Sequence, residues 1–301
     1  MSPAGFPRLV GMILTGSAAQ VGVEPFFMEL VSGMEQALMP AGISVLLLVV
    51  PDLAAELATY RRWAAETTVA AVVVVNLVHD DGRPAELAAV GLPAVLAGRY
   101  AGSADFTSVV TDDAGAMTAA MQWLHSLGHR IVGRVSGPAE LVHTAERSTA
   151  MRESGARLGV DVRIVEADYS AGRGVAGALA LLAAAEPPTA VIFDNDVMAV
   201  AAETDLVRAG VQVPGQVSLL ACDDSALCEL AVPPMSALSI DVHDHGVTIG
   251  RAVLDVLDSA PPRAHLGPTI RILSRDSTGP APSEPGCVAS LAPAGGHPAP
   301  G

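Results

Sequence analysis

Residues 189–210 read TAVIFDNDVMAVAAETDLVRAG. The apolar run Ala190–Phe193 predicts a buried strand, and the spaced apolar residues of Val197–Ala209 predict a helix. The polar triplet at 194–196 therefore lies at the carboxyl end of the strand and at the start of the helix. Such residues can cap the helix, and the same edge of an open α/β sheet is where ligands bind. Both roles remain open at this point, while a strand that leads directly into a helix indicates a βαβ unit.

Strand and helix patterns alternate in the same way along most of the chain. Apolar runs of strand length occupy Leu9–Leu14, Ile43–Val50, Ala70–Val75, Ile131–Val135, Val162–Glu166 and Ser218–Cys222. Helical patterns occupy Pro25–Met39, Leu53–Glu66, Ala114–Leu127, Ala145–Leu158, Ser170–Ala184 and Asp244–Asp258. Continuous apolar runs are typical of parallel strands that helices cover on both faces. We therefore predict an α/β fold of two doubly wound parallel-sheet lobes, which divide near VSGP at 135–138.

The composition argues against several classes of protein. The net charge is −15 and all 17 basic residues are arginine, so chemistry that depends on lysine is excluded. A chain this acidic lacks the positive field that binding a nucleic-acid backbone requires. No apolar run approaches the roughly 20 residues of a membrane span, and we expect no membrane contact. Cys222, Cys228 and Cys287 suggest no disulfide framework, so we expect a reducing, cytoplasmic location.

Other predicted strands also end in acidic residues. Asp52 follows VVP, and the acidic doublets at 112–113 and 223–224 follow VVT and LLAC. For each of these acids, helix capping and ligand contact both remain open. A carboxylate can accept hydrogen bonds from two hydroxyls, and Asn195 can both donate and accept. Together these side chains suit a polar, neutral ligand that is rich in hydroxyls.

Three further motifs have simpler explanations. GRGVAG at 172–177 has GxGxxG spacing, but ADYSA separates it from the preceding strand, so we interpret it as the start of a helix. HDH at His243–His245 has no partner cluster of Cys or His, and we interpret it as a second helix start. LGH at 127–129 predicts an ordinary helix end. We predict no cofactor and no metal, and no nucleophile–base pair indicates an enzyme.

The order of these elements resembles that of a known family. The matching stretches are PFFMELVSGMEQAL, VVTDDAGAMTAAMQWLHSLGHRIVGRVSGP, AERSTAMRESGARLGV, VIFDNDVMAVAAETDLVRAGVQVPGQVSLLACDDS, VPPMSALSIDVHDHG and ILSRDSTGP. They cover roughly residues 8–280. In this order they resemble the effector-binding core of lactose-repressor-type (LacI family) transcriptional regulators, whose fold is shared with periplasmic sugar-binding proteins.

The resemblance implies two lobes that are joined by three crossovers, with an effector in the cleft between them. It places the N-terminal lobe at 8–135 plus 242–266 and the C-terminal lobe at 136–241 plus 267–280. The Pro/Gly/Ala-rich segment 281–301 predicts a disordered tail.

The resemblance also implies ligand contacts for Arg147, Asp223, Asn195, Tyr169, His143 and Asp112. The planar guanidinium of Arg147 can bind vicinal hydroxyls or a carboxylate, and the ring of Tyr169 offers a flat apolar face. The residues alone leave other roles open: Arg147 could pair with Glu146 or Glu153 on a helix surface, and Tyr169 could belong to the core. The resemblance implies that the effector is a small polar molecule, a sugar or a related compound, while departures from the family pattern, such as Cys222 in place of the usual aromatic, leave a smaller or more apolar effector open.

We therefore expect a non-catalytic sensor, the effector-binding and dimerisation part of a LacI-type regulator, with a homodimer contact partly on Pro25–Met39. The family binds DNA through a helix-turn-helix segment that this chain lacks, so we expect no DNA contact from these residues. One alternative is a solute-binding protein of the same fold that serves a transporter, although the first apolar patch is short for a signal peptide. A remote alternative is an NAD-dependent enzyme that uses GRGVAG.

Overall fold

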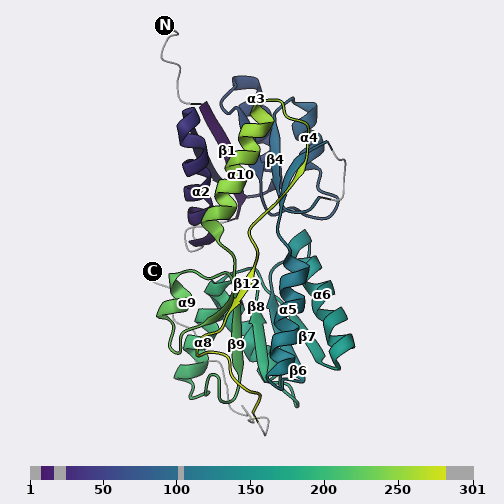
Figure 1. The fold of residues 1–301 in the computed structure, drawn as a ribbon, viewed down its shortest axis with the longest axis vertical. Helices are drawn as coiled ribbons and strands as arrows, with labels where there is room; N and C mark the ends of the chain where they lie inside the picture. Colours follow the sequence, from purple (N-terminus) through teal and green to yellow (C-terminus); the bar gives the residue numbers. More distant parts are fainter. Residues whose placement is uncertain (1–7, 17–24, 101–104, 283–301) are drawn as a thin grey trace, which may run out of the picture. The chain divides into compact units, whose positions relative to one another are not determined.

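The computed structural model describes residues 8–16, 25–100 and 105–282, and Figure 1 shows their arrangement. They form two six-stranded sheets and group into two compact units. Of the described residues, unit 1 comprises those from 8 to 118, 138–150 and 238–271, and unit 2 comprises 119–137, 151–237 and 272–282. The predicted α/β fold with two doubly wound parallel-sheet lobes is thus confirmed.

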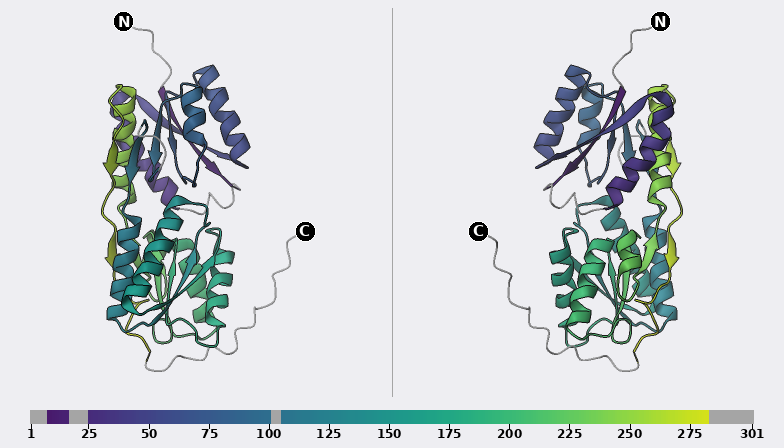
Figure 2. Two further views of the ribbon diagram at one scale, coloured as in Figure 1. Left: turned by 90° about the vertical axis from the view of Figure 1, so that its right-hand side faces the viewer. Right: turned by 90° about the vertical axis from the view of Figure 1, so that its left-hand side faces the viewer.

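The sheet of unit 1 has the strand order β11-β5-β4-β3-β1-β2. Its strands are β1 (Arg8–Thr15), β2 (Ile43–Val50), β3 (Ala71–Val74), β4 (Ala94–Ala97), β5 (Thr107–Val110) and β11 (Ala264–Leu266). Neighbouring strands run parallel. Helices α2 (Pro25–Leu38) and α10 (Val242–Leu257) cover one face, and α3 (Leu53–Glu66) and α4 (Arg83–Ala89) cover the other (Figure 2). Burial on both faces explains why these strands are apolar without alternation.

Helices α2 and α10 pack closely because glycines lie where they meet. A Cβ atom at Gly33 would collide with the carbonyl of His243, and one at Gly246 would collide with the carbonyl of Leu30. The apolar residues of α2, among them Leu30 and Met34, are for the most part buried or packed against the core of unit 1. Because this helix has more apolar residues than one buried stripe requires, we predicted that some of them form a dimer contact. In the structure most of them pack inside the protomer.

The sheet of unit 2 has the strand order β12-β10-β9-β8-β6-β7. Its strands are β6 (Ile131–Ser136), β7 (Asp161–Glu166), β8 (Ala190–Phe193), β9 (Ser218–Cys222), β10 (Ser236–Ser239) and β12 (Arg271–Leu273). Helices α5 (Asp113–Ser126) and α6 (Val142–Leu158) lie on one side of it, and α7 (Ala171–Leu182) and α8 (Asp196–Arg208) lie on the other (Figure 2). The short helix α9 (Ala226–Leu230) follows β9. Strands β8 and β9 are buried along their whole length.

The chain passes from one sheet to the other after β5, after β10 and after β11, so the three predicted crossovers are confirmed. The predicted boundary at residue 135 differs from this division, because β6 pairs with β7 and β8 and already belongs to the second sheet. The helical pattern of α5 follows β5 without any break in the strand–helix alternation, so the sequence carries no signal of the crossing there. Of the predicted tail, residues 283–301 lie outside the described residues.

The predicted strands and helices are present with boundaries shifted by a few residues. The short strands β4, β10, β11 and β12 and the short helices α4 and α9 were not predicted, because elements of three to seven residues show too little periodicity.

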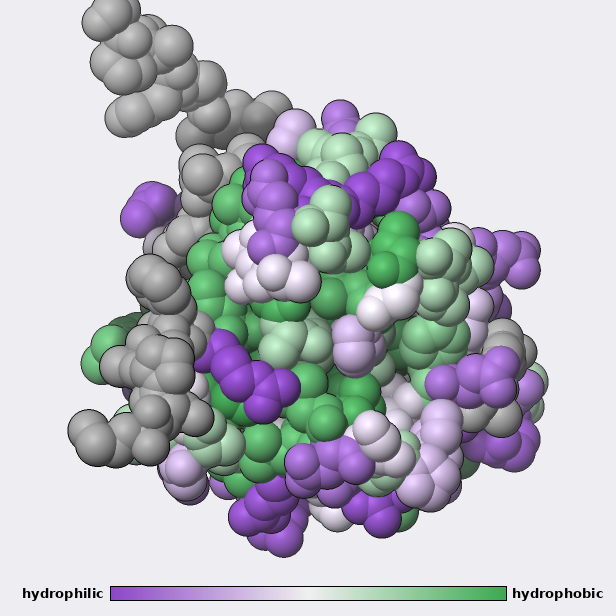
Figure 3. Space-filling view, turned by 90° about the horizontal axis from the view of Figure 1, so that it is seen from above, coloured by the Kyte–Doolittle hydropathy of each residue, from purple (hydrophilic) through white to green (hydrophobic). Residues whose placement is uncertain are grey.

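The surface carries both hydrophobic and hydrophilic residues. Figure 3 shows a face on which hydrophobic residues gather in the middle and hydrophilic residues form a rim. Single exposed apolar side chains are common on proteins, so only a contiguous group of them indicates an interaction.

Candidate functional site

Three of the six predicted ligand residues follow strands of unit 2. Tyr169 follows β7, Asn195 follows β8 and Asp223 follows β9. The carboxyl ends of parallel strands meet at one edge of a sheet, so the fold brings these residues to the same edge. The structure therefore supports their grouping, while contact with a ligand stays a prediction.

Asn195 joins two of these segments through its amide. The side-chain oxygen accepts a hydrogen bond from the Met198 backbone at 2.9 Å, which caps α8. The side-chain nitrogen donates to the carbonyl of Tyr169 at 3.1 Å. Asn195 is only 2% exposed, so the amide is held in a fixed orientation. The capping role is thus present, and the amide also holds the backbone of Tyr169 in place.

Tyr169 and Asp223 both adopt the left-handed backbone region, with φ of 67° and 66°. Such a conformation costs about 1–3 kcal/mol for a residue other than glycine, and such residues cluster at functional sites. The ring of Tyr169 lies against the backbone of Gly137, where a Cβ atom would collide with it. Tyr169 also packs against the core of unit 2, so the core role that the sequence left open is present as well.

Asp194 has a structural role beneath this edge. Its carboxylate forms two hydrogen bonds of 2.6 Å with the guanidinium of Arg134, and both side chains are fully buried. It also accepts the backbone N–H of Gly137 at 2.9 Å. The pair therefore fastens the end of β6 to the end of β8. Sequence reasoning missed Arg134, although an arginine within the apolar strand IVGRVS is itself a signal of a buried partner.

The other acids at this edge are also engaged. Asp196 accepts the backbone N–H of Ser225 at 3.0 Å, which connects the start of α8 to the segment before α9. Asp224 pairs with Arg275 through bonds of 2.6 and 3.0 Å. Asp223 is half-buried, and its carbonyl accepts the Cys228 thiol at 3.8 Å. Asp194, Asp196 and Asp224 thus all take part in contacts within unit 2, while contact of Asp223 with a ligand stays a prediction.

The predicted residues Arg147, His143 and Asp112 belong to unit 1. Arg147 pairs with Asp113, with N–O distances of 2.6 and 2.7 Å, while Glu146 pairs with Arg99. Asp112 is exposed and caps α5 by accepting the Gly115 N–H at 2.9 Å. The structure therefore places the neighbouring acid, Asp113, beside Arg147. Asp113 was missed because a doublet of acids does not reveal which carboxylate turns inward.

Asp113 is the centre of a small cluster of charges. Burial would raise the pKa of Asp113, but the charges of Arg147 and His143 and hydrogen bonds from Thr111 and Arg147 hold it below its usual value. The Thr111 hydroxyl donates to the second carboxylate oxygen at 2.7 Å. His245 also lies near Asp113, and its Nδ1 is buried without a hydrogen-bond partner among the described atoms. The carboxylate of Asp113 therefore stays ionised and holds the guanidinium of Arg147 in place.

A buried ion pair fixes the loop after β3, which contacts the start of α6. Arg83 donates to Asp81 at 2.6 Å and to the carbonyl of Asn76 at 2.8 Å. Burial would raise the pKa of Asp81, and bonding to Arg83 lowers it below the usual value. The carbonyl of Leu77 in this loop accepts the backbone N–H of Val142 at 2.9 Å. The loop thereby supports the end of the helix that carries His143 and Arg147.

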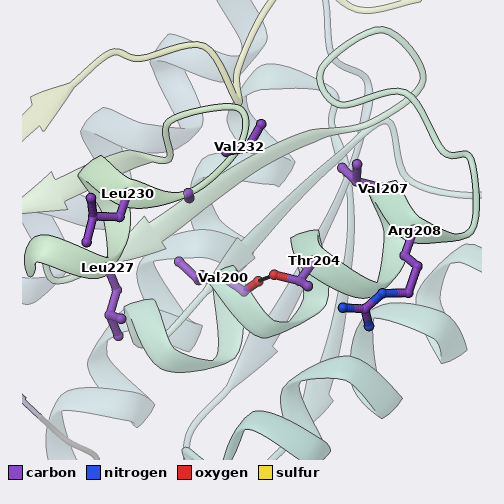
Figure 4. A pocket seen from close by; sticks show the side chains of 8 residues that line it. Val200, Thr204, Val207, Arg208, Leu227, Leu230 and Val232 are labelled. Carbon is purple, nitrogen blue, oxygen red and sulfur yellow. Dashed lines mark hydrogen bonds between the residues drawn. The ribbon is translucent and has the colours of Figure 1, made fainter.

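A hollow with exposed apolar residues in its lining lies elsewhere in unit 2. It has a volume of about 420 Å³ and is lined by Val200, Thr204, Val207, Arg208, Leu227, Leu230, Ala231 and Val232 (Figure 4). We call this surface the α8–α9 patch. Leu230 and Val232 are each 78% exposed. None of the six predicted ligand residues lines the patch, so it is separate from the candidate ligand site.

Two kinds of feature are absent from the part of the chain that the structure describes. No group of three or more His, Cys, Asp or Glu side chains there could hold a metal ion. No helix within the same residues is long and apolar enough to cross a membrane.

Comparison with known proteins identifies relatives for most of the chain. Residues 121–278 match the family model of the periplasmic binding protein-like domain. The chain is 29% identical to the HTH-type transcriptional regulator CelR of Thermobifida fusca over 82% of this chain and 74% of that protein. It is 26% identical to the HTH-type transcriptional repressor PurR of Photobacterium profundum, over 83% of this chain and 73% of that protein.

Solved structures show the same similarity. A LacI family transcriptional regulator from Bifidobacterium animalis superposes with a TM-score of 0.83 and 29% identity, covering 92% of this chain and all of that one. A complex of the transcriptional regulator CelR with cellobiose superposes with a TM-score of 0.82 and 26% identity, covering 91% of this chain and 86% of that one. The resemblance found in the sequence motifs is thus confirmed at the level of the fold.

Proposed function

The chain belongs to the periplasmic binding protein-like family, and from this premise we propose that it is the effector-sensing module of a LacI-type transcriptional regulator. Its effector is a small polar molecule, a sugar or a related compound. The observation that carries the proposal is the similarity to CelR over 82% of the chain, together with the CelR–cellobiose complex among the structural neighbours. We propose that the protein is not an enzyme, that it works in the cytoplasm, and that DNA contact requires a helix-turn-helix segment.

The side chains at the strand ends support a neutral, hydroxyl-bearing effector. Asp223 and Asn195 supply oxygen and amide groups that suit hydroxyls. Arg147 is already neutralised by Asp113, so an anionic effector would have to compete with a buried carboxylate. We therefore propose Arg147, His143, Tyr169, Asn195, Asp223 and Asp112 as the residues that contact the effector.

A screen by thermal unfolding tests this function. Sugars that include cellobiose, polyols and nucleobases are added to the protein one at a time. A compound that binds only the folded state raises the melting temperature by an amount that grows with its concentration relative to its dissociation constant. Stabilisation by at least one neutral compound is the expected result. Conversion of that compound into a product, with or without an added nicotinamide cofactor, would favour an enzyme instead.

We predict that Arg147→Ala and Asp223→Ala each weaken the binding of the stabilising compound, measured by calorimetry, by roughly tenfold to a hundredfold. Each change removes charge-assisted hydrogen bonds that contribute about 1.5–3 kcal/mol. Arg152→Ala is the matched control, because Arg152 is an exposed arginine of the same helix. If both variants bind the compound with unchanged affinity, then Arg147 and Asp223 do not contact it and have only structural roles.

We also propose that the regulator forms a homodimer through the α8–α9 patch. The patch groups exposed apolar side chains of two helices, as an interface core requires. Arg208 and Glu229, both largely exposed, bring opposite charges to the same surface. In a twofold dimer the patch of one copy faces the same patch of the other copy, so Arg208 of one copy can lie close to Glu229 of the other.

We predict that the protein sediments as a dimer at micromolar concentration and that Leu230→Asp makes it a monomer. The new charge would have to be buried without a partner at the centre of the interface. Leu266→Asp is the control, because Leu266 is 85% exposed in unit 1 and does not belong to the patch. Dimers of equal affinity in both variants would place the interface elsewhere.

A further inference from the structure

Glu203 is an acidic residue inside the core of unit 2. It lies on α8 and is only 1% exposed. Its Oε1 atom is buried and has no hydrogen-bond partner in the described part of the chain. An ionised carboxylate in such a place loses its hydration and gains nothing in return, so the position strongly favours the protonated form.

Glu203 lies directly beside the α8–α9 patch. Val200 is one helical turn before it and Val207 is one turn after it, and both line the patch. Side chains one turn apart are neighbours on a helix surface. Asp196 is two turns earlier on the same side of α8, and it binds the backbone of Ser225 just before α9. Glu203 therefore lies on the side of α8 that carries Val200 and Val207, next to the residues that line the patch.

No nearby charge relieves this burial. The elements packed against α8 are α7, β8, β9 and α9. Their titratable side chains are Arg173 of α7, Cys222 of β9, and Cys228 and Glu229 of α9, and α8 itself also carries Asp196, Asp205 and Arg208. Burial alone raises the pKa of Glu203 to about 7, without a contribution from any of these groups.

We propose that Glu203 is a proton switch for the association of two copies of this chain through the α8–α9 patch. With the carboxyl group protonated, the patch stays apolar and pairs with a second copy. When the carboxyl group loses its proton, the charged carboxylate needs water molecules to hydrate it. The adjoining hollow can hold that water. Charge and water at the patch then oppose pairing. This inference rests on the proposed dimer interface.

The direction of the pH effect follows from linkage. A second copy that covers the patch removes the water of the adjoining hollow, so ionisation of Glu203 costs more in the dimer and the dimer holds the proton more tightly than the monomer does. A state that binds more protons becomes less favoured as the pH rises. Each dimer contains two such carboxyl groups. We therefore expect the dimer dissociation constant to increase at least about tenfold between about pH 6 and about pH 8.

Sedimentation velocity at these two pH values, with the intact chain, tests the switch. Glu203→Gln and Glu203→Met both remove the titrating group, and either is expected to give a dimer whose dissociation constant hardly changes with pH. Two variants are used so that the result does not depend on one of them folding. Glu153→Gln, which changes an exposed glutamate of α6 outside the α8–α9 patch, is expected to keep the pH dependence of the wild type.

The outcomes separate the switch from the proposals on which it rests. If the wild-type dimer has the same dissociation constant at both pH values, the switch is wrong, but the proposed interface is not contradicted. The same pH dependence in the Glu203 variants assigns the titration to another group and also overturns it. A monomer under all conditions overturns both the switch and the interface, while the thermal-unfolding screen for effectors remains an independent test of sensing.

Discussion

Replacement of Arg134 by methionine is expected to lower the free energy of unfolding by about 3–5 kcal/mol. The guanidinium is fully buried and is bound through two nitrogens to Asp194, at 2.6 Å for each contact. Methionine fills a similar volume but removes the guanidinium, so the carboxylate of Asp194 stays buried without the positive charge that compensates it. Urea unfolding followed by circular dichroism measures the loss.

Arg163→Met is the matched control for this change. Arg163 lies on β7, the strand next to β6, and its ion pair with Asp161 is partly exposed. Exposed pairs contribute at most about 1 kcal/mol, so this variant should stay close to the wild type. The double variant Arg134→Met with Asp194→Leu removes both buried charges and should recover part of the loss. A loss below about 1 kcal/mol in Arg134→Met would show that Asp194 finds another partner or is protonated.

The polar triplet after β8 shows how far the sequence could predict the candidate site. The pattern correctly placed the triplet between a strand and a helix, because apolar runs and capping residues are local signals. The three residues then take three different roles: an ion pair in the core, a helix cap and a link to the loop before α9. The partner of Asp194 lies 60 residues earlier in the chain. Its identity depends on β6 and β8 being neighbours, which local patterns do not reveal.

The ion pair of Arg147 shows the same limit. Reasoning along one helix offers only nearby acids as partners, such as Glu146 and Glu153. In the structure Glu146 pairs with Arg99, and Arg147 pairs with Asp113 at the start of another helix. The family resemblance was able to mark Arg147 as a candidate ligand residue, but it did not identify the buried carboxylate that positions it. Partners from distant segments had to come from the three-dimensional structure.

Local patterns were also ambiguous where an ionisable residue lies on the buried face of a helix. Glu203 interrupts the buried stripe of α8, and from the sequence alone a glutamate at this position could equally lie on the exposed side. HDH was interpreted as a capped helix start, and Asp241 does cap α10 by accepting the Asp244 N–H at 2.8 Å. The pattern did not show that His245 would be buried against Asp113. Both residues matter because burial, and not sequence spacing, controls their protonation.

Acidification is expected to destabilise the protein through His245. This side chain is 7% exposed, and burial lowers its pKa to about 4, although the charges of Asp113 and Asp244 act in the opposite direction. The unfolded chain therefore takes up a proton near the ordinary imidazole pKa of about 6.5, while the folded protein does not. Stability is fully present above about pH 6.5 and is lost as the pH falls to about 4, by about 3 kcal/mol in total. His129, whose pKa burial also lowers, adds to the loss.

Comparison of the wild type with His245→Gln isolates this effect from all other titrating groups. Urea unfolding at about pH 7.5, 5.5 and 4.5 gives the free energy of each protein, and the difference between them is the quantity of interest. Glutamine does not titrate, so the advantage of the wild type should shrink by about 2–3 kcal/mol across this range. Thr248→Val is the control, because Thr248 lies on the same helix and neither side chain titrates, so its difference from the wild type should stay nearly constant. If the difference for His245→Gln is equally constant, then the folded protein accepts a proton at His245 as readily as the unfolded chain does, and the cluster around Asp113 must open to water in acid.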